Sequence, residues 1–177
     1  MNEYIEQIQD THCDMTRTTE KKFRVLRNIG MAAPYFPENE SVLCFGSGDG
    51  FEIEIWRRLG FRAVGCEISK VKREIARSHG LYSWADRTEV LGNHNIYCAH
   101  TIEHVTDVED TLGWFVKTCV STLCLIFPIE PYGSKNPSHL SPIKSMEQLR
   151  IPRMEVVLKF EHWNDEREGV LIYQQRS

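Results

Sequence analysis

The sequence predicts an α/β fold built on a doubly wound, mostly parallel sheet. Short apolar runs closed by glycine or proline alternate with helical patterns between residues 41 and 127. These runs are continuous rather than alternating, which is typical of strands buried on both faces. The repeated strand, helix, strand order requires right-handed crossovers, which cover both faces of the sheet with helices.

One domain is the simplest division of the chain. It has 177 residues, of which 41% are hydrophobic, and this is enough to fill a single core. The sequence contains no internal repeat, low-complexity tract or linker rich in proline or serine. We therefore predict a single domain, with an N-terminal helical segment over residues 1–38 and an α/β core over residues 40–177.

Glycines and apolar spacing mark the elements of the first half. Phe51, Ile55 and Leu59 recur at helical spacing, and Gly60 and Gly80 stand where helices commonly stop. The predicted elements, in order, are a helical segment within residues 2–30, a strand over 41–45, a helix over 51–59, a strand over 62–66, a helix capped by Ser69 and a weaker strand over 81–85.

The second half changes from strand and helix alternation to a hairpin. Thr106 and Glu109 have the spacing of a capping box that opens a helix, and Ser141 followed by Pro142 predicts a short helix. A polar tract separates the last two strand-like segments, which predicts an antiparallel hairpin. The predicted elements are a strand over 95–99, a helix from the capping box to Thr118, a strand over 120–127, the short helix after Ser141, and strands over 154–160 and 170–174.

Composition argues against several classes of partner. The formal charge of −4 provides no basic face for a nucleic acid, and the longest apolar run, residues 120–127, is too short to span a bilayer. The N-terminus lacks the pattern of a secretory signal, so we expect a cytoplasmic protein. The six cysteines show no zinc-ligand spacing and lie mostly in apolar runs, where they act as small buried hydrophobes. We therefore expect no metal site.

A glycine-rich loop follows the first predicted strand and precedes a helix. Its residues, 46–50, are Gly-Ser-Gly-Asp-Gly, and Glu67 ends the next strand about 20 residues later. Glycine lets the backbone turn sharply and approach a ligand, while a carboxylate at the neighbouring strand end accepts ribose hydroxyls. Taken separately, the glycines could be explained by a tight turn, and Glu67 by an ordinary carboxylate at the surface. Together they predict a site for a ligand that contains adenosine.

The spacing of the glycines separates the classes of ligand. A dinucleotide site has a third glycine three positions after the second, and this chain has Phe51 there. NAD is therefore the second candidate. The loop also lacks the lysine and serine of a phosphate-binding P-loop.

Three segments carry a family resemblance. Residues 42–50, residues 65–69 and the run Thr101-Ile102-Glu103-His104-Val105 together resemble class I S-adenosylmethionine-dependent methyltransferases, most closely the ubiquinone/menaquinone-biosynthesis-like group that methylates small molecules. The resemblance covers about residues 40–175. It implies a Rossmann-like, seven-stranded sheet with an antiparallel C-terminal hairpin, S-adenosylmethionine as the cofactor and a small-molecule acceptor or an exposed side group as the substrate.

The same resemblance implies which residues hold the cofactor. The glycine loop lies under its methionine part, Glu67 binds the ribose, and Asp86 contacts the adenine amino group, although Asp86 by itself is also a typical helix cap. The implied cofactor-binding residues are Gly46, Ser47, Gly48, Gly50, Glu67, Ile68, Asp86 and Ala99.

Two positions depart from the family pattern. The family commonly has an acidic residue two positions before the first glycine, where this chain has Cys44, and an aspartate at the start of the fourth strand, where it has Asn95. These changes favour an alternative function: a domain that binds S-adenosylmethionine or its demethylated product with little or no turnover.

Methyl transfer itself is an in-line displacement that needs alignment rather than a metal. A general base near the methyl group helps when the acceptor carries a proton, and histidine titrates in the useful range. Position along the chain makes His100 the first candidate, followed by His139 and His104. The structural alternatives are that His104 caps or orients its loop and that His139 caps the helix after Ser141.

Overall fold

The computed structural model describes residues 19–163 and 167–175. The chain divides into two compact units, Met1–Gly92 and Asn93–Ser177, so the single domain stays a prediction. The part of the predicted N-terminal helical segment before residue 19 lies outside the described residues.

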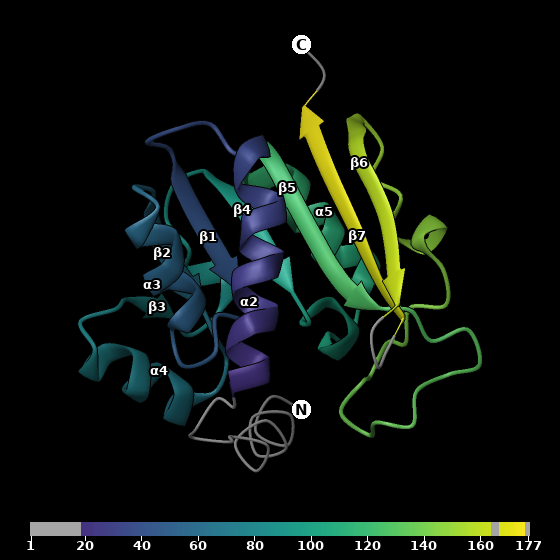
Figure 1. Ribbon diagram of the computed structural model, residues 1–177, viewed down its shortest axis with the longest axis horizontal. Helices are drawn as coiled ribbons and strands as arrows, with labels where there is room; N and C mark the ends of the chain where they lie inside the picture. The colour runs from purple at the N-terminus through teal and green to yellow at the C-terminus, as the bar shows by residue number, and fades with distance from the viewer. Residues whose placement is uncertain (1–18, 164–166, 176–177) are drawn as a thin grey trace. The chain divides into compact units, whose positions relative to one another are not determined.

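The first unit alternates strands and helices as the sequence predicts (Figure 1). The strands β1 and β2 have the bounds that the apolar runs predict, and they pair in parallel from Ser41↔Arg62 to Phe45↔Cys66. The elements are α2 Thr19–Ala32, η1 Ala33–Tyr35, β1 Ser41–Phe45, α3 Phe51–Arg58, β2 Arg62–Cys66, α4 Lys70–Ser78, β3 Ser83–Trp84 and η2 Arg87–Glu89.

Two local signals in this unit have different outcomes. The Ser69 side chain accepts a hydrogen bond from the backbone N–H of Lys72, so the predicted cap of α4 is confirmed. The strand predicted over 81–85 is wrong in extent, because β3 contains only Ser83 and Trp84. The chain leaves the sheet there because Asp86 turns it into the 3-10 helix η2.

An aromatic cluster forms much of the core beside α3. Trp56 is fully buried, and its ring centroid lies 4.7 Å from that of Phe36 and 5.0 Å from that of Phe61. Burial of one large apolar side chain stabilises a fold by about 1.5–3 kcal/mol. These contacts anchor α3, whose N-terminus begins at the glycine loop.

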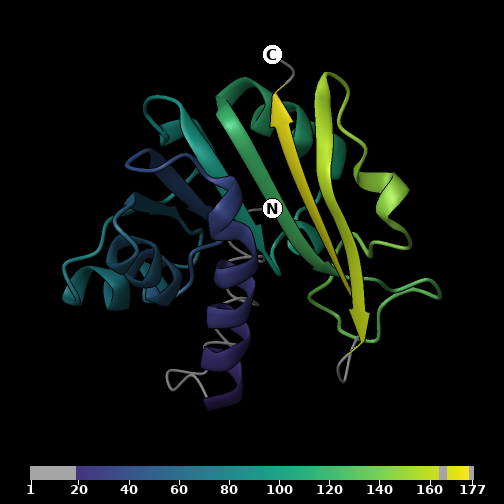
Figure 2. The same cartoon turned by 45° about the horizontal axis from the view of Figure 1, so that its top comes forward.

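The second unit continues with two parallel strands and then a hairpin. Figures 1 and 2 both show β5, β7 and β6 side by side. The predicted hairpin is confirmed, because β6 and β7 pair antiparallel from Met154↔Gln175 to Trp163↔Arg167. The elements are β4 His94–Ala99, η3 Ile102–His104, α5 Val108–Thr118, β5 Cys119–Pro128, η4 Met146–Leu149, β6 Met154–Trp163 and β7 Arg167–Gln175.

The predicted fold class is confirmed in its strand count and directions. Three parallel strands in the order β3-β2-β1 belong to the first unit, and four strands in the order β4-β5-β7-β6 belong to the second. Parallel pairing of β4 with β5 gives way to antiparallel pairing of β5 with β7. The seven strands are thus mostly parallel with an antiparallel C-terminal pair, as in the Rossmann-like class.

Two predicted helix starts in the second unit are wrong. The N-cap of α5 is Asp107, whose Oδ1 accepts the backbone N–H of Asp110, so Thr106 and Glu109 are not its capping box. No helix follows Ser141, whose hydroxyl instead donates to the carbonyl of Val105. The short helix begins later, after Ser145, which does form a capping box with Gln148.

Within residues 19–163 and 167–175, no helix combines the length and the apolar character that crossing a membrane requires.

Candidate functional site

The glycine loop of the first unit has a backbone that only glycine adopts readily. Gly46, Gly48 and Gly50 have φ values of 74°, 55° and 89°, all in the left-handed region. The backbone N–H groups of Gly46 and Ser47 both donate to the carbonyl of Cys66, at 2.7 and 3.2 Å. Two backbone hydrogen bonds therefore hold the loop against the end of β2.

Glu67 lies directly against this loop. One of its carboxylate oxygens, Oε2, accepts the backbone N–H of Gly48 at 2.8 Å, and Oε1 accepts the N–H of Ser69 at 2.9 Å. The residue is only 4% exposed. A carboxylate offers about four acceptor positions, so two remain for the hydroxyls of a ligand after these bonds. The adjacency of Gly48 and Glu67 that the sequence predicts is present, while their ligand role stays a prediction.

Arg73, which no sequence pattern indicated, binds the backbone just after β2. Its Nη1 donates to the carbonyl of Glu67 at 2.7 Å and also to that of Ile68. A guanidinium that holds two successive carbonyls sets the direction in which the Glu67 side chain leaves the backbone. The only sequence signal is its place near the start of a helix that follows the acidic residue.

Ser47 points into the protein rather than toward solvent. It is fully buried, and its hydroxyl lies 3.1 Å from that of Ser83. A Cβ on Gly65 would lie 2.8 Å from the Cβ of Ser47 and 2.7 Å from Cδ1 of Ile53. Because Gly65 has no side chain, Ser47 of the glycine loop and Ile53 can pack against β2 at this position.

Gly50 also has a packing role. A Cβ there would lie 2.6 Å from Cδ1 of Leu81 and 3.0 Å from the Cβ of Ala76. Its missing side chain therefore faces the interior beside α4. Gly50 is therefore required for packing against Leu81 and Ala76, while its contact with a cofactor stays a prediction.

Asp86 performs its alternative role, that of a helix cap. Its Oδ1 accepts the backbone N–H of Thr88 at 2.8 Å and the Thr88 hydroxyl at 2.7 Å, as an N-cap does. These two bonds lower the pKa of the Asp86 carboxyl. The group stays ionised at neutral pH and keeps acceptor capacity for an adenine amino group.

The two positions that depart from the family pattern, Cys44 and Asn95, are both buried in strands of the sheet. Cys44 is fully buried in β1, and burial followed by the charge of Glu52 raises the pKa of its thiol, so it is neutral. Asn95 lies where the β4–β5 register shifts, and its Oδ1 accepts the backbone N–H of Thr122 at 2.8 Å. Cys44 is therefore a buried neutral side chain of β1, and Asn95 links β4 to the neighbouring strand β5.

The three candidate histidines and Ala99 belong to the second unit. Ala99 ends β4, where it is buried and pairs with Ile126. His100 follows with a φ of 50°, unusual for a residue other than glycine. Its Nε2 lies 2.8 Å from Oε1 of Glu168, and its Nδ1 lies 3.9 Å from Oε1 of Glu103. Both carboxylates are nearly inaccessible, so His100 is held between two buried acidic groups.

His104 and His139 are close together in this unit. Their rings cross almost perpendicularly with centroids 4.8 Å apart. The Nδ1 of His104 lies 2.8 Å from the carbonyl of Ser138, and that of His139 lies 3.0 Å from the carboxylate of Glu130. The predicted capping of a helix after Ser141 by His139 is wrong, because that helix does not form.

Comparison with known proteins gives different results for sequence and structure. No protein-family model matches the chain, and a comparison with curated proteins finds no match. Solved structures do match. Magnesium protoporphyrin IX methyltransferase from Synechocystis, with bound SAH, has a TM-score of 0.69 at 10% identity, covering 91% of this chain and 89% of its own. The chain has the class I methyltransferase fold.

Two further structures agree with this fold assignment. A SAM-dependent methyltransferase from Anabaena variabilis has a TM-score of 0.68 at 17% identity, covering 86% of this chain and 84% of its own. Coclaurine N-methyltransferase has a TM-score of 0.69 at 12% identity, with 92% and 75% covered. The structures thus show the fold that the sequence resemblance implies, while the ubiquinone-like group stays a prediction.

Proposed function

We propose that the chain binds S-adenosylmethionine and transfers its methyl group to a small-molecule acceptor. The observation that carries the proposal is the 2.8 Å hydrogen bond from the Gly48 backbone N–H to the Glu67 carboxylate. It places a left-handed glycine turn and an acidic strand end together on a class I methyltransferase fold. The structural neighbours support the same ligand, since magnesium protoporphyrin IX methyltransferase is solved with SAM and with SAH.

The residues of the first unit fit an adenosine ligand. The glycines provide an approach without side chains, Glu67 retains acceptor positions for ribose hydroxyls, and Asp86 offers an oxygen to the adenine amino group. Ser47 acts indirectly, because its buried hydroxyl fixes the loop against Ser83. S-adenosylmethionine, when bound, supplies an activated methyl group on a sulfonium.

The proton of the acceptor requires a base when the acceptor is a hydroxyl or a protonated amine. We assign this role first to His100, which Glu168 orients through Nε2 at 2.8 Å. His139 and His104 remain the second and third candidates.

The acceptor and the location follow from the same proposal. Two neighbours are a porphyrin methyltransferase and an alkaloid N-methyltransferase by name, which supports a small-molecule acceptor for this chain as well. Five cysteines among the described residues are buried thiols, and this fits the reducing conditions of the cytoplasm.

Calorimetric titration with S-adenosylmethionine and S-adenosylhomocysteine tests the binding step. We expect Glu67→Gln to weaken binding by about 1–3 kcal/mol, the scale of lost charge-assisted hydrogen bonds. Glu74→Gln, an exposed change on α4, is the matched control and should bind like the parent. Asp86→Asn retains the oxygen that caps η2, so it tests the adenine contact with little risk to folding. A parent chain that binds neither compound would contradict the proposal.

A methyl-release assay with mixed acceptors then tests turnover. We expect methyl release by the parent and a strong loss in His100→Ala with unchanged cofactor affinity. Binding without any release would instead identify the chain as a binding domain.

A further inference from the structure

Three side chains of the second unit converge although they come from two separate loops. Glu103 and His104 lie in η3 after β4, and His139 lies in the loop after β5. One nitrogen of each ring and one oxygen of the carboxylate all lie within 4.8 Å of one another. Glu103 is only 1% exposed, and both histidines are half-buried.

The hydrogen bonds of His104 determine which nitrogen has a lone pair. Its Nδ1 lies 2.8 Å from the carbonyl of Ser138, which only accepts, so Nδ1 carries a hydrogen. In the neutral ring Nε2 is then an electron-pair donor, and it lies 3.9 Å from Oε1 of Glu103. Two donor atoms therefore point at the same small volume.

His139 is arranged in the same way. Its Nδ1 lies 3.0 Å from the Glu130 carboxylate, and its Nε2 lies 3.1 Å from Nδ2 of Asn136. The Asn136 amide oxygen accepts from the N–H and the hydroxyl of Ser138, which fixes the amide so that Nδ2 faces the ring. Nδ1 is thus the donor and Nε2 the acceptor.

Both rings therefore have the tautomer that metal binding needs. Metal-ligating histidines typically donate their other ring N–H to a carbonyl or a carboxylate, which fixes the orientation of the ring. Here Ser138 and Glu130 accept those two bonds. The cluster is a pair of oriented imidazoles beside one buried carboxylate.

We propose that Glu103, His104 and His139 bind a divalent transition-metal ion, with zinc as the metal to test first. Imidazole favours zinc and related metals, whereas calcium and magnesium prefer sites made of oxygen alone. Two histidines and one glutamate leave a fourth zinc position open for water or another oxygen ligand, as in catalytic sites. Metal binding here does not require methyl transfer, and it gives His104 and His139 a ligand role in place of that of a general base.

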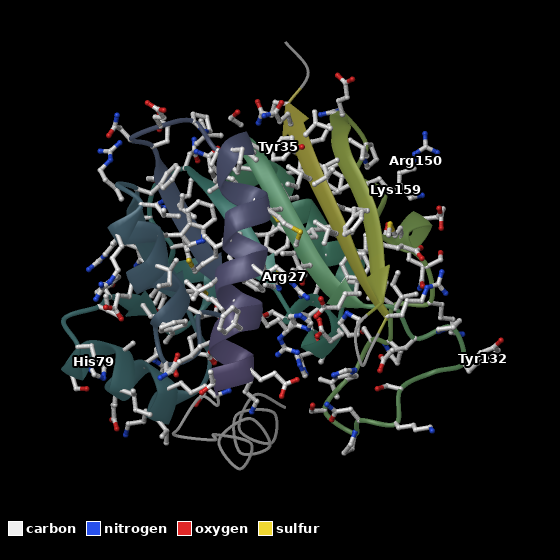
Figure 3. All side chains as sticks on the ribbon, viewed as in Figure 1. Arg27, Tyr35, His79, Tyr132, Arg150 and Lys159 are labelled. Atoms are coloured by element: carbon white, nitrogen blue, oxygen red, sulfur yellow. The ribbon has the colours of Figure 1, made fainter. Side chains whose placement is uncertain are left out.

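Metal binding requires a modest contraction of the site. Ligand atoms around tetrahedral zinc lie about 3.3 Å apart, given Zn–N distances of about 2.0–2.1 Å, and the donor atoms here are up to 4.8 Å apart. His139 must also exchange its contact with the exposed Asn136 amide for the metal. Its loop projects beyond the strands, and Tyr132 on the same loop is fully exposed (Figures 2 and 3).

Zinc titration of the full chain after chelator treatment tests the site. We expect one zinc per chain, and a loss of affinity in His104→Ala and His139→Ala of more than about 100-fold, beyond the effect of losing an outer-shell partner. Glu103→Gln, which keeps the shape of the side chain, should also weaken binding. His79→Ala is the matched control, because His79 is an exposed histidine at the end of α4 (Figure 3).

Cobalt absorption identifies the donor atoms. We expect nitrogen and oxygen ligation without a thiolate charge-transfer band, and a Cys13→Ser background removes the one thiol that lies outside the described residues. Thermal unfolding with and without zinc should show stabilisation of the parent but not of the two histidine variants. The proposal is overturned if the parent binds no zinc, if the histidine variants bind it as tightly as the parent, or if cobalt binds through thiolates.

Discussion

Gly65 is the residue where packing most clearly limits the candidate site. A methyl group there would overlap Ser47 and the end of Ile53. We expect Gly65→Ala to lower the free energy of unfolding by about 1–3 kcal/mol, the usual cost of overpacking, and to displace the glycine loop. Urea unfolding checks the first effect, and titration with S-adenosylhomocysteine checks the second.

Gly113 provides the matched control for this substitution. It lies within α5, and a Cβ would meet no atom within 4 Å. Gly113→Ala should therefore raise the free energy of unfolding by about 0.5–1 kcal/mol, because alanine favours the helix. Equal effects of the two substitutions would contradict the packing argument.

The Cys66 thiol gives a residue-scale prediction about pH. Burial, followed by the charge of Glu67, raises its pKa from an ordinary value of 9.0 to about 12. A group whose pKa is higher in the folded state contributes its full stability below pH 9. That contribution disappears as the pH rises from about 9 to about 12.

A double difference isolates this thiol from other groups that titrate at high pH. Between about pH 8 and about pH 10.5, the parent should lose roughly 2 kcal/mol more unfolding free energy than Cys66→Ala. Urea unfolding at the two pH values measures it. Identical losses in both proteins would show that the thiol is accessible to water in the folded state.

At the scale of an element, the sequence pattern and the structure give different N-caps for α5. The pattern favours Thr106 as the N-cap, but Asp107 accepts the N–H of Asp110 at 2.9 Å. We expect Asp107→Ala to cost about 1 kcal/mol of stability, the typical value of an N-cap, and Thr106→Ala to cost little. Chemical denaturation of both variants measures the difference, and the reverse order would favour the capping box.

The short segment that follows β4 contains three ionisable side chains close together: His100, Glu103 and His104. Within η3 and the residues just before it, His100 and Glu103 approach each other while His104 turns toward Ser138. Glu168 reaches His100 from β7, where it pairs with Pro128 across the antiparallel ladder. The C-terminal hairpin therefore contributes a carboxylate beside His100 as well as strands to the sheet.

For the whole molecule, ligand binding should appear as added stability. A ligand that binds only the folded state at about 100 times its Kd adds about 2.7 kcal/mol, which for a chain of this size is a rise of roughly 5–10 °C in Tm. We expect this rise with S-adenosylhomocysteine in calorimetric melting, and a smaller one in Glu67→Gln. NADH serves as the comparison ligand, and a larger shift with NADH would favour a nicotinamide enzyme.

Local signals in the sequence predicted much of the first unit. The bounds of β1 and β2 follow from continuous apolar runs, and the cap of α4 follows from Ser69, since each depends on neighbours in the chain. The adjacency of the glycine loop and Glu67 was predicted for a related reason, because parallel strands end at the same edge of a sheet.

Only the tertiary structure decided which of several similar side chains does a given task. Asp107 rather than Thr106 caps α5, and Arg73 rather than a loop residue holds the carbonyl of Glu67. The cluster of Glu103, His104 and His139 was missed because no spacing rule relates residues that come from different loops. Most helices and strands follow from contacts between neighbours in the chain, whereas the hydrogen bonds and ion pairs between distant residues depend on how those elements pack.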